Sequence, residues 1–219
     1  MADYGAMLTD VNGVAFYITD TLPLSLIEVK TLTLNLPGTY YGQAIAHADD
    51  GLPRVVFIQS SGGPSNAFYY TMANGNWYIR GTANAVVRVY IFGYKYQIPP
   101  KWGIAIWDAN GNCVITNETK VLSGITNLGT EGQDSSGYKL DTTLVGSWAV
   151  APAIDGMFIG VVGQPNPHTV QIPFATNAYY NGTTTRINSN ATGTDSGPFL
   201  STTYLNSNIR LQCINVARY

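Results

Sequence analysis

The sequence KWGIAIWDANGNCVITNET, residues 101–119, decides the fold class of this chain. It contains an aromatic-Gly pair, a hydrophobic run, the motif Asp-x-Asn-Gly and a second hydrophobic run. The sequence DYGAMLTDVNGVAFYITDT, residues 3–21, has the same order at an offset of 98 residues, from Asp10 to Asp108. Asn-Gly between apolar runs is the strongest short-range signal for a β-hairpin. Both stretches therefore predict two antiparallel strands joined by a tight turn.

The turn residues of these hairpins are Asn12-Gly13 and Asn110-Gly111. A two-residue loop of type I′ requires positive φ at both central residues, which Asn and Gly adopt at the lowest cost. We therefore expect both pairs to form two-residue loops at equivalent corners of two similar modules. A third pair, Asn74-Gly75, fits the same use.

The offset also predicts how the chain is divided. We expect two β-sandwich-like modules of antiparallel strands, residues 1–98 and residues 99–219, and the repeat is consistent with an internal duplication. The boundary falls at Pro99-Pro100, because proline cannot donate to a sheet ladder and stiffens the chain. The second module is richer in polar segments, and we interpret the longest of them, residues 175–198, as a loop.

Composition supports an all-β fold. Charged residues make up only 11% of the chain, against about a quarter in ordinary globular domains. Their place is taken by tyrosine (15 residues), glycine (23 residues), threonine and asparagine. Thr, Tyr, Val and Ile favour strands, whereas Asn and Gly supply turns. Hydrophobic residues alternate with a period of two in several segments, and no long stretch has the 3.6-residue period of a helix.

Charge and hydropathy exclude two classes of partner. A net charge of −2 and an isoelectric point near 5.5 provide no basic field for nucleic acid. No apolar run approaches the ~18 residues of a membrane span, and the first residues lack the basic and apolar regions of a signal peptide. The chain is therefore expected to be made in the cytoplasm and to be soluble. Cys113 and Cys213 are expected to be reduced, half-buried thiols, with a disulfide between neighbouring strands as the alternative.

A calcium loop is the sharper alternative for the Asp-x-Asn-x-Asn motif that begins at Asp108. The spacing matches the first ligands of an EF-hand loop. The sixth position, which should be glycine, is Cys113, and the twelfth, which should be glutamate, is Thr119. We therefore interpret the motif as a hairpin turn and expect no metal site.

Residues suited to catalysis are scarce. The two histidines, His47 and His168, lack the spacing of a metal-binding pair, and no Gly-x-Ser-x-Gly motif or phosphate-binding loop occurs. Asp49 and Asp50 could form the carboxylate pair of a glycosidase. They lie in HADDGLP, however, which is typical of a polar turn. The sequence therefore predicts no catalytic site, no cofactor and no enzymatic activity.

Tyrosines beside small polar residues are the most distinctive feature that remains. Aromatic rings give a large contact area at low entropic cost, and Asn, Ser and Gly supply adaptable hydrogen bonds. This combination of residues is typical of recognition surfaces. The alternative is that most of these rings fill cores and cross-strand pairs. Tyr179 and Tyr180, flanked by polar sequence, are the candidates for a partner or receptor contact.

The stretches YGAMLTDVNGVAFYI and WGIAIWDANGNCVITNETK resemble small tail-associated proteins of tailed bacteriophages and prophages of enteric bacteria. Proteins of that group open with an aromatic-Gly pair, a hydrophobic strand, Asp-x-(Asn/Ser/Asp)-Gly and a second strand. The resemblance covers the first 20 residues and roughly residues 102–120, and residues 175–198 have no counterpart. It implies a non-enzymatic virion component at the distal tail, and it assigns no functional residue.

The expected function is therefore that of a structural or adhesive component of a phage tail tip. Its partners would be neighbouring tail proteins, further copies of itself and a host-surface receptor or glycan. Two alternatives stay open. A glycan depolymerase would show a deep cleft lined by two close carboxylates. A carbohydrate-binding module would show exposed, coplanar aromatic rings.

Overall fold

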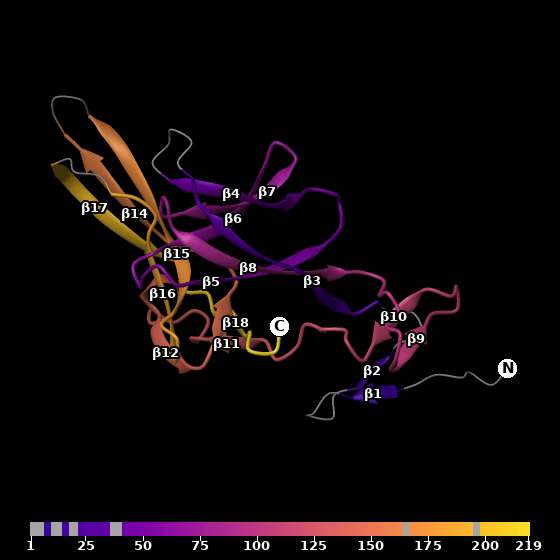
Figure 1. The fold of residues 1–219 in the computed structure, drawn as a ribbon. Helices are drawn as coiled ribbons and strands as arrows, with labels where there is room; N and C mark the ends of the chain where they lie inside the picture. The colour runs from indigo at the N-terminus through magenta and orange to yellow at the C-terminus, as the bar shows by residue number, and fades with distance from the viewer. Residues whose placement is uncertain (1–6, 10–14, 18–21, 36–40, 164–166, 195–197) are drawn as a thin grey trace. The chain divides into compact units, whose positions relative to one another are not determined.

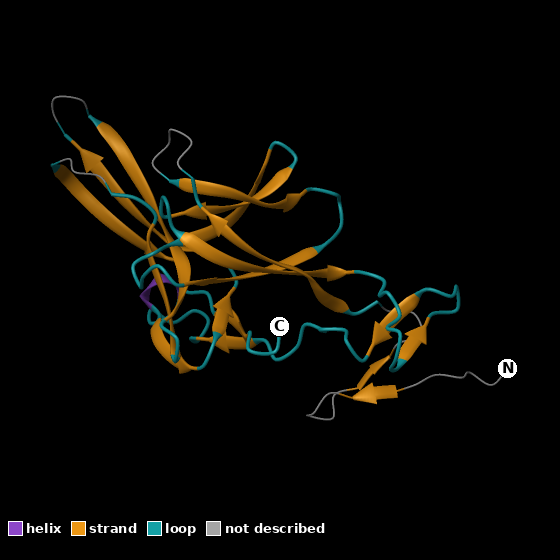
Figure 2. Cartoon of the chain, viewed as in Figure 1, coloured by secondary structure: helices purple, strands orange, loops and turns teal. Residues whose placement is uncertain are grey.

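The structure is a computed structural model, and it describes residues 7–9, 15–17, 22–35, 41–163, 167–194 and 198–219. Within these residues the chain forms eighteen β-strands and one 3-10 turn, η1 (Gly137–Lys139) (Figure 1, Figure 2). The predicted all-β class is therefore confirmed. In this part of the chain no helix is long and apolar enough to cross a lipid bilayer.

The strands range from three residues in β1 to thirteen in β15. In chain order they are β1 (Met7–Thr9), β2 (Ala15–Tyr17), β3 (Leu24–Thr33), β4 (Gly42–Ala48), β5 (Arg54–Ser60), β6 (Phe68–Ala73), β7 (Asn76–Gly81), β8 (Val86–Tyr94), β9 (Ala105–Trp107), β10 (Cys113–Thr116), β11 (Thr126–Leu128), β12 (Asp141–Val145), β13 (Trp148–Val150), β14 (Ile154–Val162), β15 (His168–Tyr180), β16 (Thr184–Ala191), β17 (Phe199–Asn206) and β18 (Leu211–Asn215). The longest strand, β15, pairs with β14, β16, β5 and β6 at different points along its length.

The chain forms two compact units, each built from separate segments. One consists of Met1–Glu28, Leu52–Val55 and Ile91–Ser123, and the other of Val29–Gly51, Val56–Tyr90 and Gly124–Tyr219. This division differs from the expected cut between residues 98 and 99. Neither unit is a continuous half of the chain, because β3, β5 and β8 each begin in one unit and end in the other.

The first unit contains two hairpins at the positions predicted from the Asp-x-Asn-Gly motifs. β1 pairs antiparallel with β2, and β9 pairs antiparallel with β10. The strands keep the 98-residue offset, because β1 begins at residue 7 and β9 at 105, and β2 begins at 15 and β10 at 113. Buried Val114 and Ile115 pack against Leu22, Ile106 and Val121, which gives this unit a small apolar core.

Beyond the hairpins, the strand pairing does not repeat with the same offset. β12 and β16 lie about 98 residues after β4 and β8, and β12 pairs with β16. β4 instead pairs with β7, while β8 pairs with β3 and β5. The pairing thus supports a repeat of the hairpin alone. The duplication of two whole sandwich-like modules is not confirmed.

The loop of the second hairpin is longer than predicted. The N–H of Asp108 donates to the carbonyl oxygen of Asn112 at 2.9 Å, and the N–H of Gly111 donates to the carbonyl of Asp108 at 3.1 Å. Gly111 has a φ of 82°, whereas Asn110 keeps a negative φ. Residues 109–111 therefore form a three-residue loop in place of the expected type I′ turn. The cause is the Asp108 carboxylate, whose Oδ1 accepts the N–H groups of both Asn110 and Asn112.

The same carboxylate explains the calcium-like spacing of its motif. Oδ1 and Oδ2 of Asp108 accept hydrogen bonds from the backbone and side chain of Asn112, and these bonds lower the pKa of Asp108. The acid therefore closes a turn with groups of its own hairpin. Among the described residues, no three His, Cys, Asp or Glu side chains gather where they could hold a metal ion.

The two-residue turn predicted for Asn74-Gly75 is confirmed. The last residue of β6 pairs with the first residue of β7, so only these two residues form the loop. Their φ angles are 50° and 70°, which is the geometry of a type I′ turn. Asn12 and Gly13, for which the same turn was expected, lie outside the described residues.

Most of the large sheet lies in the second unit. Its main path runs β11-β18-β13-β5-β15-β6-β7-β4, with β14 and β17 branching from one side of β15 and with β16 and β12 from the other (Figure 1). Phe57, Phe68, Ile79, Ile187 and Ile214 are fully buried. They come from β5, β6, β7, β16 and β18, so the core of this unit draws on strands from the whole length of the chain.

The polar segment 175–198, interpreted from sequence as a loop, instead contributes to two paired strands. Residues 174–180 of β15 pair with residues 185–191 of β16. The reason is that the polar side chains form hydrogen bonds inside the fold. The carboxamide Nδ2 atoms of Asn177, Asn188 and Asn190 all donate to the carbonyl of Pro64, at 3.3, 3.1 and 3.0 Å. Buried carbonyls need such donors, so asparagine is placed where an apolar strand residue would leave them unsatisfied.

Both cysteines are free and buried. Cys113 lies on β10 and Cys213 on β18, in different units, in agreement with the expectation of reduced thiols. The Cys213 Sγ lies 3.5 Å from the carbonyl of Thr126, and burial raises the pKa of this thiol to about 11. Cys213 is therefore uncharged at neutral pH and acts as a small core residue.

Candidate functional site

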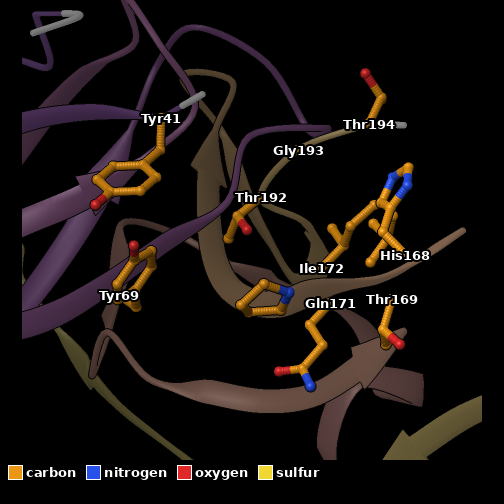
Figure 3. A pocket seen from close by; sticks show the side chains of 11 residues that line it. Tyr41, Tyr69, His168, Thr169, Gln171, Ile172, Thr192, Gly193 and Thr194 are labelled. Atoms are coloured by element: carbon orange, nitrogen blue, oxygen red, sulfur yellow. The ribbon is translucent and has the colours of Figure 1, made fainter. Parts of the chain in front are cut away.

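A cleft of about 530 Å³ opens in the second unit beside the first half of β15. Four parts of the chain line it: Tyr41 before β4, Tyr69 on β6, the start of β15 and the residues that follow β16. The side chains of Tyr41 and Tyr69 stand at one end of the cleft, and those of His168 and Thr194 at the other (Figure 3). The complete lining is Tyr41, Tyr69, His168, Thr169, Val170, Gln171, Ile172, Pro173, Thr192, Gly193 and Thr194.

The floor of the cleft includes a free strand edge. Residues 168–173 of β15 pair with β14 on one side, whereas β16 covers the other side only from Phe174 onward. The N–H of Thr192 donates to the carbonyl of Pro173 at 2.9 Å, which fixes the side toward which the backbone groups of Pro173 point. Backbone groups alternate along a strand, so those of Gln171 and Thr169 point to the same side. They have no partner strand among the described residues.

The tyrosine end of the cleft is built on the strands β4, β7 and β6. Gln43, Arg80 and Tyr69 are in register across these strands, so their side chains share one face. The rings of Tyr41 and Tyr69 meet edge to face, with centroids 6.4 Å apart. The guanidinium carbon of Arg80 lies 5.4 Å from the ring centroids of both Tyr41 and Tyr78. Cation–π contacts of this kind hold the arginine between two rings.

The electrostatics of this end keep the Tyr69 hydroxyl group neutral. Burial and the neighbouring Tyr41 raise the pKa of Tyr69, while the charge of Arg80 and its hydrogen bond lower that pKa by a smaller amount. The Tyr69 phenol is therefore protonated at physiological pH. With the threonines and Gln171, it offers the cleft uncharged donors and acceptors.

The start of β6, which carries Tyr69, is fixed by hydrogen bonds on both sides. Ala67 donates its N–H to Thr82 Oγ1 at 2.9 Å and accepts the N–H of Thr82 at 3.0 Å. Asn190 Nδ2 donates to the carbonyl of Asn66 at 2.7 Å. The position of Tyr69 is thus set by strand β16 as well as by its own hairpin.

A second aromatic cluster lies on the opposite face of the same strands, because neighbouring residues on β6 point to opposite faces. Tyr70 and Trp77 stack with ring centroids 4.6 Å apart and an interplanar angle of 18°. The His47 ring lies 6.3 Å from Trp77, and its Nε2 is hydrogen-bonded to the Tyr70 hydroxyl. The Trp77 indole N–H points to Asp49 Oδ1 at 3.4 Å. These rings are half-buried and pack on one another, with His47 tilted by 44° from Tyr70, so they do not form an exposed coplanar surface.

The residues expected to matter from sequence lie mostly away from the cleft. Tyr179 and Tyr180 are half-buried at the end of β15, and the Tyr180 hydroxyl donates to the carbonyl of Gly182 at 2.6 Å. Their role in a partner contact stays a prediction. Asp49 and Asp50 are exposed after β4, and Asp49 accepts the N–H of Gly51 in a turn, as interpreted from sequence.

The sequence contains the doublets Tyr40-Tyr41 and Tyr69-Tyr70, but no local pattern indicates that Tyr41 and Tyr69 lie together. The doublet Tyr69-Tyr70 does indicate a ring on each face of a sheet, because consecutive residues of a strand point to opposite faces. What was missing is the register of β4, β7 and β6, which puts Tyr41 near Tyr69. His168 was set aside as a lone histidine, and it lines the cleft.

Comparisons of the chain with protein-family models, with curated proteins and with solved structures give no match. Function has to be inferred from the residues of the chain and from the geometry of the cleft.

Proposed function

We propose that this chain is a structural and adhesive protein of a bacteriophage tail tip, and that its cleft binds a saccharide on the host surface. The observation that carries the proposal is the cleft itself, which combines two tyrosine rings with uncharged hydrogen-bonding groups. Its volume of about 530 Å³ falls within the ~300–1,000 Å³ typical of small-ligand sites. The resemblance of the hairpin stretches to tail-associated proteins supports a location in a phage tail.

A saccharide fits the chemistry of the cleft better than an apolar ligand does. A sugar ring has an apolar face of C–H groups, which packs on an aromatic ring, and a periphery of hydroxyl groups. Tyr41 and Tyr69 supply the rings, while Gln171, Thr192 and the free edge of β15 supply donors and acceptors. Each contact is weak, so tight attachment would come from several copies acting together.

The surface of β17 supports assembly into a multi-copy structure. This strand pairs only with β14 among the described strands, so its other edge has no partner there. Leu200, Tyr204 and Leu205 are exposed on it, and the strand contains no charged residue or proline. Proteins usually protect such edges with charge or proline. An unprotected, apolar edge is expected to be covered by a neighbouring tail protein or by another copy.

A second candidate function follows from the free edge of β15. An extended peptide could add to the edge at Thr169 and Gln171 by strand addition, with its side chains in the cleft. In that case the cleft would hold a segment of a neighbouring tail protein. A peptide would be recognised through its backbone, and binding would therefore depend little on the tyrosines.

The saccharide proposal predicts that Tyr69→Ala weakens binding about tenfold, which corresponds to ~1.4 kcal/mol. The loss has a physical cause, since the ring packs at the end of the cleft and its hydroxyl is a donor there. The measurement is calorimetric titration with oligosaccharides released from the lipopolysaccharide of enteric bacteria.

Tyr70→Ala is the matched control, because it removes a tyrosine from the same strand but from the opposite face. We expect its affinity to stay within twofold of the unmodified chain. The reverse result, a loss with Tyr70→Ala and none with Tyr69→Ala, would move the site to the cluster around Trp77. Unchanged affinity in both variants would contradict a tyrosine-based saccharide site altogether.

A further inference from the structure

Arg80 contacts both tyrosines that line the cleft, although it is not itself one of the lining residues. It lies over the Tyr41 ring at 5.4 Å and donates a hydrogen bond to the Tyr69 hydroxyl. Its Nε is buried and has no hydrogen-bond partner among the described residues. A buried N–H without a partner costs about 1–3 kcal/mol, so such a group calls for an explanation.

The residues that line the cleft bring no negative charge to Arg80. None of the residues that line it is acidic, and the one titratable side chain there besides the tyrosines is His168, at the end opposite the tyrosines (Figure 3). The ion pairs Lys139–Asp134, Arg186–Asp141 and Arg210–Glu131 do not involve Arg80. The positive charge of Arg80 is therefore not neutralised by a carboxylate among the described residues.

We infer that the cleft selects an acidic saccharide, one that carries a carboxylate, and that Arg80 provides the selectivity. This inference rests on the proposed saccharide function and names the class of ligand. The guanidinium contacts both rings, so a carboxylate bound against them would lie near a single positive charge that can balance it. The rings of Tyr41 and Tyr78 fix the orientation of the guanidinium, so little side-chain freedom is lost when a ligand binds.

The packing around Arg80 also explains why a neutral ligand would gain less. Burial strengthens the interaction between the guanidinium and a negative charge, since solvent screens it less. A neutral hydroxyl group could pack against the same rings but would leave the charge unbalanced. The tyrosines and Gln171 serve both ligands equally, so they cannot supply the preference.

The test uses a matched pair of probes, trigalacturonic acid and the same trisaccharide with its carboxyl groups reduced to neutral hydroxymethyl groups. We expect the unmodified chain to bind the acid at least fivefold more tightly at low salt, and the preference to shrink at 0.5 M NaCl. Arg80→Gln should bind the neutral trisaccharide as before and lose the preference for the acid.

Arg88→Gln is the control, because Arg88 also lies over a tyrosine ring, at 5.3 Å from Tyr90, but that ring does not line the cleft. It should keep the full preference. Equal binding of both probes by the unmodified chain, with the expected loss in Tyr69→Ala, would overturn the role of Arg80 and leave the saccharide function standing. Binding of neither probe nor of lipopolysaccharide oligosaccharides would overturn both. If Arg80→Gln does not fold, a preference of the unmodified chain that is insensitive to salt overturns the inference.

Discussion

Replacing Gly81 with alanine is expected to destabilise the fold by more than about 4 kcal/mol, a range reached only when a substitution breaks the packing of a core. Gly81 ends β7 and pairs with Gly42 on one side and Phe68 on the other. A Cβ atom at this position would lie 1.8 Å from the carbonyl oxygen of Ala67 and 2.8 Å from its carbonyl carbon. These are backbone atoms, so a side-chain rotation cannot relieve the clash.

The backbone at Ala67 has little freedom to move away. Its N–H and its carbonyl are both hydrogen-bonded to Thr82, at 2.9 and 3.0 Å. A shift would break this pair and displace β6, which carries Tyr69. We therefore expect Gly81→Ala to be recovered mainly as unfolded or aggregated protein, and any folded fraction to bind saccharide poorly.

Gly193→Ala is the control for this substitution. A Cβ at Gly193 meets no atom within 4 Å, so its free energy of unfolding should stay within about 0.5 kcal/mol of the unmodified chain. Urea denaturation followed by circular dichroism gives both values. Near-normal stability of Gly81→Ala would show that β6 and β7 can separate, and it would contradict the tight pairing described for them.

Removing the charge of Asp155 is expected to stabilise the protein at neutral pH by about 3 kcal/mol. Asp155 is fully buried on β14, where the strand register shifts between Ile154 and Gly156. Its Oδ2 accepts a hydrogen bond from Ser189, but its Oδ1 is buried with no partner among the described residues. Burial raises the pKa of Asp155 from 3.8 to about 6, and each unit corresponds to ~1.4 kcal/mol.

The direction of the pH dependence of stability follows from proton linkage. Between pH 4 and pH 6 the folded chain holds a proton on Asp155 that the unfolded chain has released, so this group favours folding at low pH. Its contribution is complete below pH 4 and is lost as pH rises through 6. Asp155→Asn removes the titration, so the variant should match the unmodified chain at pH 4 and exceed it in stability at pH 7.5.

Asp141→Asn provides the opposite case. Asp141 is exposed and paired with Arg186 at 2.5 Å, and the hydrogen bond from Arg186 lowers the pKa of Asp141. Exposed pairs contribute little, so no gain in stability is expected from this variant at neutral pH. The measurement is the difference in unfolding free energy between each variant and the unmodified chain at the two pH values. A stability difference for Asp155→Asn that does not change with pH would contradict a buried, titrating carboxyl.

The hairpins and the all-β class could be predicted from the sequence because their signals are local. Asn-Gly between apolar runs fixes a turn within a few residues. The length of the second turn could not be predicted in this way, because the Asp108 carboxylate competes for the backbone N–H groups. The strands within 175–198 were missed for a related reason. Their polar side chains form hydrogen bonds with groups that are distant in sequence, such as the carbonyl of Pro64. From composition alone, a segment so rich in Asn and Thr is interpreted as a loop.

Only the types of residue that line the cleft could be predicted from the sequence. Tyrosine beside threonine and asparagine indicated a recognition surface, but the sequence pointed to Tyr179 and Tyr180, which lie at the far end of β15 from the cleft. The cleft combines β15 with residues about a hundred positions earlier, and Arg80 reaches the tyrosines that line it only through the register of β7. Strand register across such separations depends on tertiary packing, which no local pattern encodes.

The central claim is that the cleft is where a saccharide binds, and chemical-shift mapping with isotope-labelled protein tests it most directly. On titration with lipopolysaccharide oligosaccharides, the backbone amide signals of Tyr69, Thr169, Gln171 and Thr192 should shift together and saturate at one affinity. The amide signals of His47 and Trp77, whose side chains lie on the opposite face, should not shift. Shifts confined to that opposite face, or none at any position at millimolar ligand, would contradict the account.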